Sequence, residues 1–136
     1  MTIEVGSTFT DPGATALDAG DGDLTSSIVV TGSVDTSTLG TYTLTYNVSD
    51  ASGNAADPVT RTVNVVDTTI PVITLLGDIT VTIEVGTTYT DAGATATDNY
   101  DGDLTSSIAI VNNVDTSTVG TYTVTYDVSD ANNNDA

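Results

Sequence analysis

The sequence contains no cysteine and no histidine, and Arg61 is its only basic residue. Without cysteine, the chain can form no disulfide and offers no reactive thiolate. Without either residue, it lacks the sulfur and nitrogen ligands that usually hold zinc, and it lacks the side chain that most often serves as an acid–base catalyst near neutral pH. These absences exclude thiol chemistry, Cys/His zinc sites and histidine-based catalysis.

Positive charge is nearly missing, because one basic residue stands against 19 acidic ones and the formal net charge is −18. Phosphate backbones and anionic lipid surfaces repel such a chain, so we expect no nucleic-acid partner. No apolar run approaches the roughly 20 residues that a membrane span needs, so we expect no direct membrane insertion. The acidity favours divalent cations as partners instead.

Helix-forming residues are also scarce, since the acidic residues are almost all aspartate and the chain has 29 threonines. Threonine suits strands and aspartate suits turns, whereas straight-chain helix formers are nearly absent. High acidity with few aromatics can indicate disorder, but here the apolar residues are strictly patterned. The composition therefore predicts an all-β fold.

The chain repeats itself with a period of 80 residues. Residues 3–56 align without a gap onto residues 83–136, and 37 of the 54 aligned positions are identical. The substitutions mostly preserve size, as with Leu44 and Val124, which is typical of a core refilled at similar volume. Such self-similarity predicts two copies of one domain in tandem.

The alternation of apolar and polar residues predicts where the strands lie. We expect strands at residues 72–76, 80–89, 93–97, 104–111 and 120–128, and a hairpin turn at residues 50–54 that leads to a further strand at 58–66. Tyr122, Val124, Tyr126 and Val128 share one face, which we interpret as core. Short strands at this spacing indicate a β-sandwich.

The two copies of the repeat contain different parts of the 80-residue period. We assign residues 1–66 to repeat 1, without its first strand, and residues 67–136 to repeat 2, without its last strand. Unpaired strand edges would follow, and neighbouring repeats or copies of the chain, arranged head to tail, could complete them. The linker at residues 67–71 is short and contains Pro71, so we expect it to be semi-rigid.

Several motifs resemble a known family. The runs Gly40-Thr41-Tyr42 and Gly120-Thr121-Tyr122 are similar to the start of the sixth strand of immunoglobulin folds, and residues 67–73, 93–98 and 101–103 extend the likeness. Together they resemble bacterial Ig-like repeats related to HYR modules. The resemblance implies tandem immunoglobulin-like β-sandwiches in a secreted or cell-surface protein, acting as a module without catalytic activity.

Clustered aspartates suggest a metal site. In an immunoglobulin-like sandwich, the loop with Asp98, Asp101 and Asp103, the loop that Asp130 begins and the linker residue Asp67 would meet at one pole. Five carboxylates there would suit calcium, which takes six to eight oxygen ligands. In repeat 1 the equivalent residues are Asp18, Asp21, Asp23 and Asp50. The alternative is that all of these are turn-forming aspartates in solvated loops.

These observations lead to one functional prediction and one alternative. We expect a non-enzymatic structural repeat of an extracellular bacterial adhesin or filament, with calcium stiffening the joints between domains. The alternative is an accessory module that binds a surface glycan or another protein, for which Tyr100 is the obvious exposed aromatic candidate. Paired carboxylates in a pocket would indicate a glycosidase, but the modular sequence gives no sign of one.

Overall fold

The computed structural model describes all 136 residues, and its regular elements are strands apart from two single turns of 3-10 helix, η1 (Thr25–Ser27) and η2 (Thr105–Ser107). The all-β prediction is therefore confirmed. The chain divides into two compact units, Met1–Asp67 and Thr68–Ala136. Neither helix has the length or the apolar composition that a membrane crossing requires.

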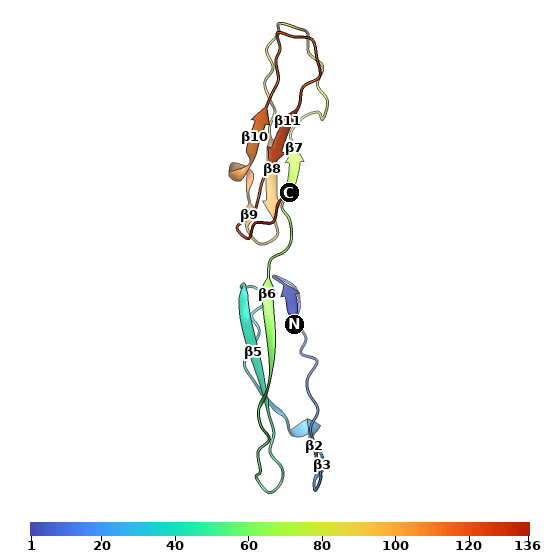
Figure 1. The fold of residues 1–136 in the computed structure, drawn as a ribbon, viewed down its shortest axis with the longest axis vertical. Helices are drawn as coiled ribbons and strands as arrows, with labels where there is room; N and C mark the ends of the chain where they lie inside the picture. Colours follow the sequence, from blue (N-terminus) through green and yellow to red (C-terminus); the bar gives the residue numbers. More distant parts are fainter. The chain divides into compact units, whose positions relative to one another are not determined.

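The first unit is built on a four-stranded sheet, in which β6 occupies a central place (Figure 1). β6 pairs antiparallel with β5 on one side and parallel with β1 on the other, and β4 pairs with the far edge of β5. A small antiparallel pair, β2 with β3, lies outside this sheet. The bounds are β1 (Thr2–Glu4), β2 (Leu17–Asp18), β3 (Gly22–Asp23), β4 (Val29–Thr31), β5 (Gly40–Asn47) and β6 (Val59–Val66).

The core of the first unit forms where apolar residues alternate along β5 and β6. Leu44 and Tyr46 of β5 are buried, and so are Val63 and Val65 of β6. The threonines between them on β5 lie on the other face, as a period of two requires. Val5, just after β1, completes this core.

A tyrosine at the start of β5 carries a feature typical of immunoglobulin-like sandwiches. The hydroxyl of Tyr42 donates a 2.8 Å hydrogen bond to the carbonyl oxygen of Thr38, and Tyr122 donates to Thr118 in the same way at 3.0 Å. This backward bond is the tyrosine corner of the immunoglobulin fold. Leu44 is buried two residues after Tyr42, at the position where antibody domains place a disulfide cysteine.

The second unit contains two smaller sheets (Figure 1). β8 lies between β7 and β9, antiparallel to both, and β10 forms an antiparallel pair with β11. Ala94 and Ala96 of β8 are buried, as are Pro71 and Val128. The bounds are β7 (Val72–Leu75), β8 (Ala94–Asp98), β9 (Gly102–Asp103), β10 (Ala109–Asn112) and β11 (Val124–Asp127).

Of the strands predicted for the second unit, one is absent and another is shorter than predicted. Residues 80–89 form no strand, and the predicted strand at 120–128 is confined to Val124–Asp127. The corresponding segments of the first unit are strands because β6 pairs with both of them. No strand of the second unit takes the place of β6, so the same sequences have no hydrogen-bonding partner there.

The opposite difference is found at the other sheet, where the second unit has the longer strand. Residues 94–98 form the five-residue strand β8 because β7 pairs with them, whereas in the first unit, which has no counterpart of β7, only Leu17–Asp18 is a strand. The predicted strand at 104–111 is likewise shortened, since η2 takes its first half and β10 its second. Pairing, as much as local sequence, decides which segments become strands.

Candidate metal site

The first acidic loop is folded around Asp98, the last residue of β8. One oxygen of its carboxylate, Oδ1, accepts the backbone N–H groups of Tyr100 at 2.8 Å and of Asp101 at 2.9 Å. Gly102 then turns the chain into β9 with a φ of 75°, in the left-handed region that glycine adopts without strain. The Asp-rich sequence thus builds its own turn and holds Asp101 beside Asp98.

The second loop, after β11, is folded around Asp130. Its Oδ1 accepts the backbone N–H groups of Asn132 and Asn134, both at 2.8 Å, and its Oδ2 accepts the side-chain amide of Asn134 at 2.6 Å. The two loops are tied together by the N–H of Ala131, which donates to Oδ2 of Asp101 at 2.8 Å. Their carboxylates are therefore fixed by backbone bonds.

Three carboxylates of the second unit gather at these loops, and we refer to them as the acidic group. Ligand oxygens of Asp98, Asp101 and Asp130 all lie within 4.8 Å of one another. Asp130 is only 7% exposed. Asp67 is the last residue of the first unit. Oδ2 of Asp98 is buried and has no hydrogen-bond partner. Buried carboxylate oxygens normally find donors, so an orphaned one among like charges is the feature of this group that needs explanation.

The electrostatics keep Asp130 ionised. Burial raises the pKa of Asp130, but the hydrogen bonds from the backbone and side chain of Asn134, and from the backbone of Asn132, lower the pKa by more. The net effect holds the pKa of Asp130 below its usual value, because these donors stabilise the charged form. Near neutral pH, Asp130 therefore offers a full negative charge to a cation.

Asp103 does not belong to the acidic group, although the sequence analysis placed it in the same candidate site. Its Oδ1 instead accepts the backbone N–H of Thr105 at 2.9 Å, just before η2 begins. Hydrogen bonds from the side chain and backbone of Thr105 lower the pKa of Asp103. Its role in the fold is to shape the start of the helical turn.

The equivalent residues of the first unit form the same local turns without gathering into a comparable group. Asp18 accepts the N–H groups of Gly20 and Asp21, and Oδ2 of Asp21 accepts the N–H of Ala51 at 2.8 Å. Asp23 accepts from the residue two places on, and Asp50 from Asn54. The structure does not bring Asp18, Asp21, Asp23 and Asp50 together as it does the acidic group.

A second polar cluster, in the first unit, had not been anticipated from the sequence. The hydroxyl of Tyr46 donates to Oδ1 of Asp11 at 2.6 Å, and Nε of Arg61 lies 3.0 Å from that hydroxyl and 3.4 Å from the same carboxylate oxygen. Nη2 of Arg61 also donates to the carbonyl of Gly13 at 2.8 Å. The hydrogen bond from Tyr46 is the main cause that lowers the pKa of Asp11. The signal available in the sequence was that the only basic residue stands in a predicted strand.

The counterpart of this cluster in the second unit has no cation. Tyr126 donates its hydroxyl proton to Asp91, with both carboxylate oxygens at 2.5 Å, and Tyr89 lies 3.3 Å from the same residue. The hydrogen bond to Asp91, assisted by burial, raises the pKa of Tyr126 to about 12. Since Arg61 is the only basic side chain in the protein, nothing here replaces it.

Tyr100, the aromatic residue that the sequence offered as a binding candidate, lies in the first acidic loop. It is 40% exposed, and it is the only aromatic residue among the exposed large apolar side chains. Tyr46, by contrast, is buried, as its place in the alternating pattern predicted. The second unit therefore presents one isolated aromatic ring beside the acidic group.

Comparison with known families accounts for nearly the whole chain. A family model described as "Bacterial surface protein, Ig-like domain" matches residues 1–65 and again residues 73–136. The two matches fall on the two copies of the repeat.

Curated relatives are much longer than this chain. The pesticidal crystal protein Cry22Aa of Bacillus thuringiensis is 36% identical over 96% of the chain, and hyalin of the sea urchin Strongylocentrotus purpuratus is 35% identical over 94%. The chain spans only 19% and 11% of these two proteins. Among solved structures, a lipoprotein from Bacteroides thetaiotaomicron is 36% identical, with a TM-score of 0.44 over 54% of this chain and 40% of that one.

Proposed function

Because this chain belongs to the family of Ig-like domains of bacterial surface proteins, we propose that it is a non-enzymatic structural repeat of an extracellular adhesin or filament. The supporting features are two sandwich-like units of one 80-residue repeat and a surface rich in threonine and aspartate. Its immediate partners are further repeats of the same kind, arranged head to tail. The repeat is a spacer whose mechanical state depends on a bound cation.

The cation that fits the acidic group is calcium. All three side chains are carboxylates, and hard oxygen ligands are what calcium selects. The single observation that carries the proposal is Oδ2 of Asp98, which is buried without a donor although its partner oxygen accepts two backbone bonds. A cation coordinated by that oxygen supplies the missing positive charge, Asp101 and Asp130 are further protein ligands, and Asp67 is the ligand that we propose from the linker.

Calcium bound in this way acts on the linker. Asp67 stands in the segment through which one repeat continues into the next, while the other three ligands stand in loops of the second unit. Without a cation, the four negative charges repel one another and favour looser arrangements. With calcium, the linker is held to the loops, so the array becomes stiffer and its linker less accessible to proteases.

Isothermal titration calorimetry on the chain with CaCl₂ tests the proposal, with Asp98→Asn as the central variant and Asp18→Asn as the matched control. We expect one site in the wild-type chain that Asp98→Asn weakens and that Asp18→Asn leaves intact, since the acids of the first unit do not gather. MgCl₂ titrated in parallel should bind more weakly, because magnesium sheds its water reluctantly.

Solution scattering checks the mechanical part of the proposal. Adding EDTA to the calcium-loaded chain should broaden its distribution of dimensions and speed cleavage near residues 67–71. A chain that binds no calcium, or that binds it with unchanged dimensions and protease resistance, contradicts the proposed role of calcium at the linker. Repetition of the experiment with Asp98→Asn separates metal binding from an effect of EDTA itself.

The second candidate is a binding module, and the exposure of Tyr100 favours it. An aromatic ring in a loop can stack on a sugar or insert into a protein partner. Screening the chain against immobilised glycans, with Tyr100→Ala as the variant, tests this function. Binding that disappears with Tyr100→Ala supports it, and the absence of any glycan ligand leaves the spacer function as the better account.

A further inference from the structure

The outer edge of β10 has no partner strand in the second unit. β10 pairs with β11 on one side, and no strand pairs with its other side (Figure 1). The strand is exposed along its whole length, and its two large apolar residues, Ile110 and Val111, are 53% and 51% exposed. An exposed strand edge with apolar side chains is a place where a further strand can add to a sheet.

The same edge is open in the first unit, although the two units contain different strands. There β6 pairs with β5 on the side away from β4, and β4 stays at the edge of the sheet with Val30 45% exposed. In the second unit β7 pairs with β8, in a different sheet from β10. Neither β6 nor β7, each of which is present in one unit alone, covers this edge. The open edge is therefore a property of the repeat itself.

The free backbone groups at the centre of this edge are those of Ile110. The N–H of Asn113 donates to the carbonyl oxygen of Thr123, which the register with β11 places directly opposite. Because hydrogen-bonded and non-hydrogen-bonded positions alternate along an antiparallel pair, Val111 turns its N–H and C=O groups toward β11, and Ile110 turns both of its groups away. An extended segment antiparallel to β10 can pair with both groups of Ile110.

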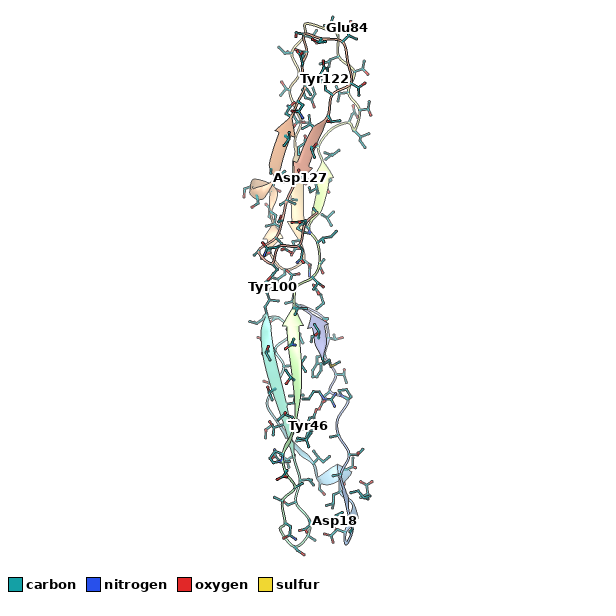
Figure 2. The ribbon with its side chains drawn as sticks, viewed as in Figure 1. Asp18, Tyr46, Glu84, Tyr100, Tyr122 and Asp127 are labelled. Carbon is teal, nitrogen blue, oxygen red and sulfur yellow. The ribbon has the colours of Figure 1, made fainter.

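The side chains beside the edge favour a basic residue at one position of such a segment. Ala109 stands opposite Asp127 in the register with β11, so their side chains lie on the same face of the sheet, and Asp127 is exposed (Figure 2). A strand added to β10 lies two strand spacings, about 10 Å, from β11. A long side chain is needed to cross that distance, and the small methyl group of Ala109 leaves room for the apolar stem of an arginine or lysine.

Charge distinguishes a basic segment from a second copy of the chain as the occupant. Every charged side chain of the second unit is acidic. A second copy paired through its own β10 would bring like charge to the edge and would offer no basic side chain to Asp127. In the first unit, Val29 and Asn47 take the places of Ala109 and Asp127, so the edge of β4 lacks both the small residue and the carboxylate.

We propose that the outer edge of β10 is a docking site for an extended segment of another protein, antiparallel to β10, with two apolar residues followed by a basic one. The first residue lies opposite Val111 and the second opposite Ile110, where they cover exposed apolar surface. The third, an arginine or lysine, lies opposite Ala109 and reaches Asp127. This surface is separate from the acidic group, so the proposal goes beyond the proposed function and does not depend on calcium.

Two peptides of identical composition test the proposal on the intact chain in buffer with EDTA. The first is Thr-Thr-Val-Ile-Arg-Thr-Thr with both ends capped, and the second exchanges its valine and arginine. In nitrogen–proton NMR spectra, the first peptide should shift the amides of residues 109–112 saturably. It should bind about threefold more tightly than the second, because only its arginine lies opposite Ala109 and an exposed ion pair contributes modestly. Both peptides carry the same charge, so general attraction to an acidic protein does not distinguish them.

A third peptide and two protein variants locate the contacts. The first peptide with an N-methyl group on its isoleucine should lose binding, because that nitrogen would donate to the carbonyl of Ile110. In Asp127→Asn the two arginine peptides should bind equally. Asp78→Asn, which removes the same charge from an exposed place in the same unit, should keep the threefold preference. Residues 29–31 of the first unit should show no preference between the peptides.

Four outcomes would overturn the proposal. They are no saturable shift at residues 109–112 up to the solubility limit of the peptide, equal affinity of the two arginine peptides for the wild-type chain, a preference that survives Asp127→Asn, and the same preference at residues 29–31. Light scattering of the chain alone, at low and high salt, tests the competing occupant. A monomer agrees with a free edge, whereas a dimer in which the amides of residues 109–112 are protected from exchange assigns the edge to a second copy and overturns the proposal.

Discussion

The backbone N–H of Ala131 donates a 2.8 Å hydrogen bond to Oδ2 of Asp101, which stands 30 residues earlier in the chain. The bond joins the loop after β8 to the loop after β11, and it is made equally by Ala51 and Asp21 in the first unit, at 2.8 Å. Asp101 thus has a structural role that both repeats share. Its membership of the acidic group is a feature of the second unit alone.

The two roles of Asp101 can be separated by Asp101→Asn. An asparagine keeps an oxygen that can accept the N–H of Ala131, so the loops should stay joined, but it removes one negative charge from the acidic group. We expect the calcium affinity to fall by about tenfold or more, since affinity follows the number of charged ligands. Calorimetric titration with calcium measures this, and the melting temperature in EDTA should be nearly unchanged.

Asp21→Asn is the matched control for that experiment. It makes the same chemical change at the same hydrogen bond, in a unit whose acidic residues do not gather. We expect calcium affinity equal to that of the wild-type chain. If Asp21→Asn weakens calcium binding as much as Asp101→Asn does, the measured ion is held by diffuse surface charge instead of by the acidic group.

The sequence predicted the fold class and the turns better than it predicted the strands. The alternation of residues 120–128 is that of a strand, yet residues 120–123 form none, because a strand exists only when a partner completes its hydrogen bonds. The identical alternation in residues 40–47 forms a full strand beside β6. Local pattern shows which residues can pair, and only the arrangement of the whole unit shows whether they do.

The residues of the candidate site were likewise predicted only in part. Asp98, Asp101 and Asp130 were predicted to meet because sandwich topology places their two loops at one pole, and their oxygens do meet. Asp103 was included because it is near in sequence, but its carboxylate is used by a local turn at Thr105. The cluster around Arg61 was missed, since Asp11 lies in an irregular segment whose position no periodicity reveals.

The packing of β6 makes a direct prediction about the stability of the first unit. Val63 is fully buried, so Val63→Ala removes two methyl groups and leaves a cavity, and we expect it to lower the free energy of unfolding by about 2 kcal/mol. Val59→Ala, on the same strand but at a position that is 62% exposed, should cost less than about 0.5 kcal/mol. Urea unfolding followed by circular dichroism compares the two. Equal losses would show that β6 is not packed as described.

The tyrosine corner gives a matched pair of variants, one in each unit. Tyr42→Phe and Tyr122→Phe each remove a hydroxyl that donates to a backbone carbonyl four residues earlier. Each should lower the free energy of unfolding by about 1 kcal/mol, the usual net value of such a hydrogen bond. Chemical denaturation with tyrosine fluorescence measures both. An unchanged midpoint in both variants would mean that these bonds contribute nothing to the stability of the corner.

Tyr126 should make the chain sensitive to alkaline pH. Its hydrogen bond to Asp91 raises its pKa from 10.0 to about 12, so the folded chain holds this proton more tightly than the unfolded chain does. The resulting contribution to stability is fully present below pH 10.0, and it is lost as the pH rises through about 12. Burial also raises the pKa values of Tyr46 and Tyr89, but ultraviolet titration of tyrosinate absorbance should show a separate late step of Tyr126 near pH 12.

Two variants assign that late step to the pair. Tyr126→Phe should remove the step from the titration curve, and Asp91→Asn should move it back toward 10.0, because a neutral amide no longer penalises the phenolate. Tyr100→Phe is the control, since Tyr100 is exposed and its backbone N–H is bonded to Asp98, not to Asp91. A late step that survives in Tyr126→Phe belongs to another tyrosine, and the hydrogen bond between Tyr126 and Asp91 would then not govern the alkaline behaviour of the second unit.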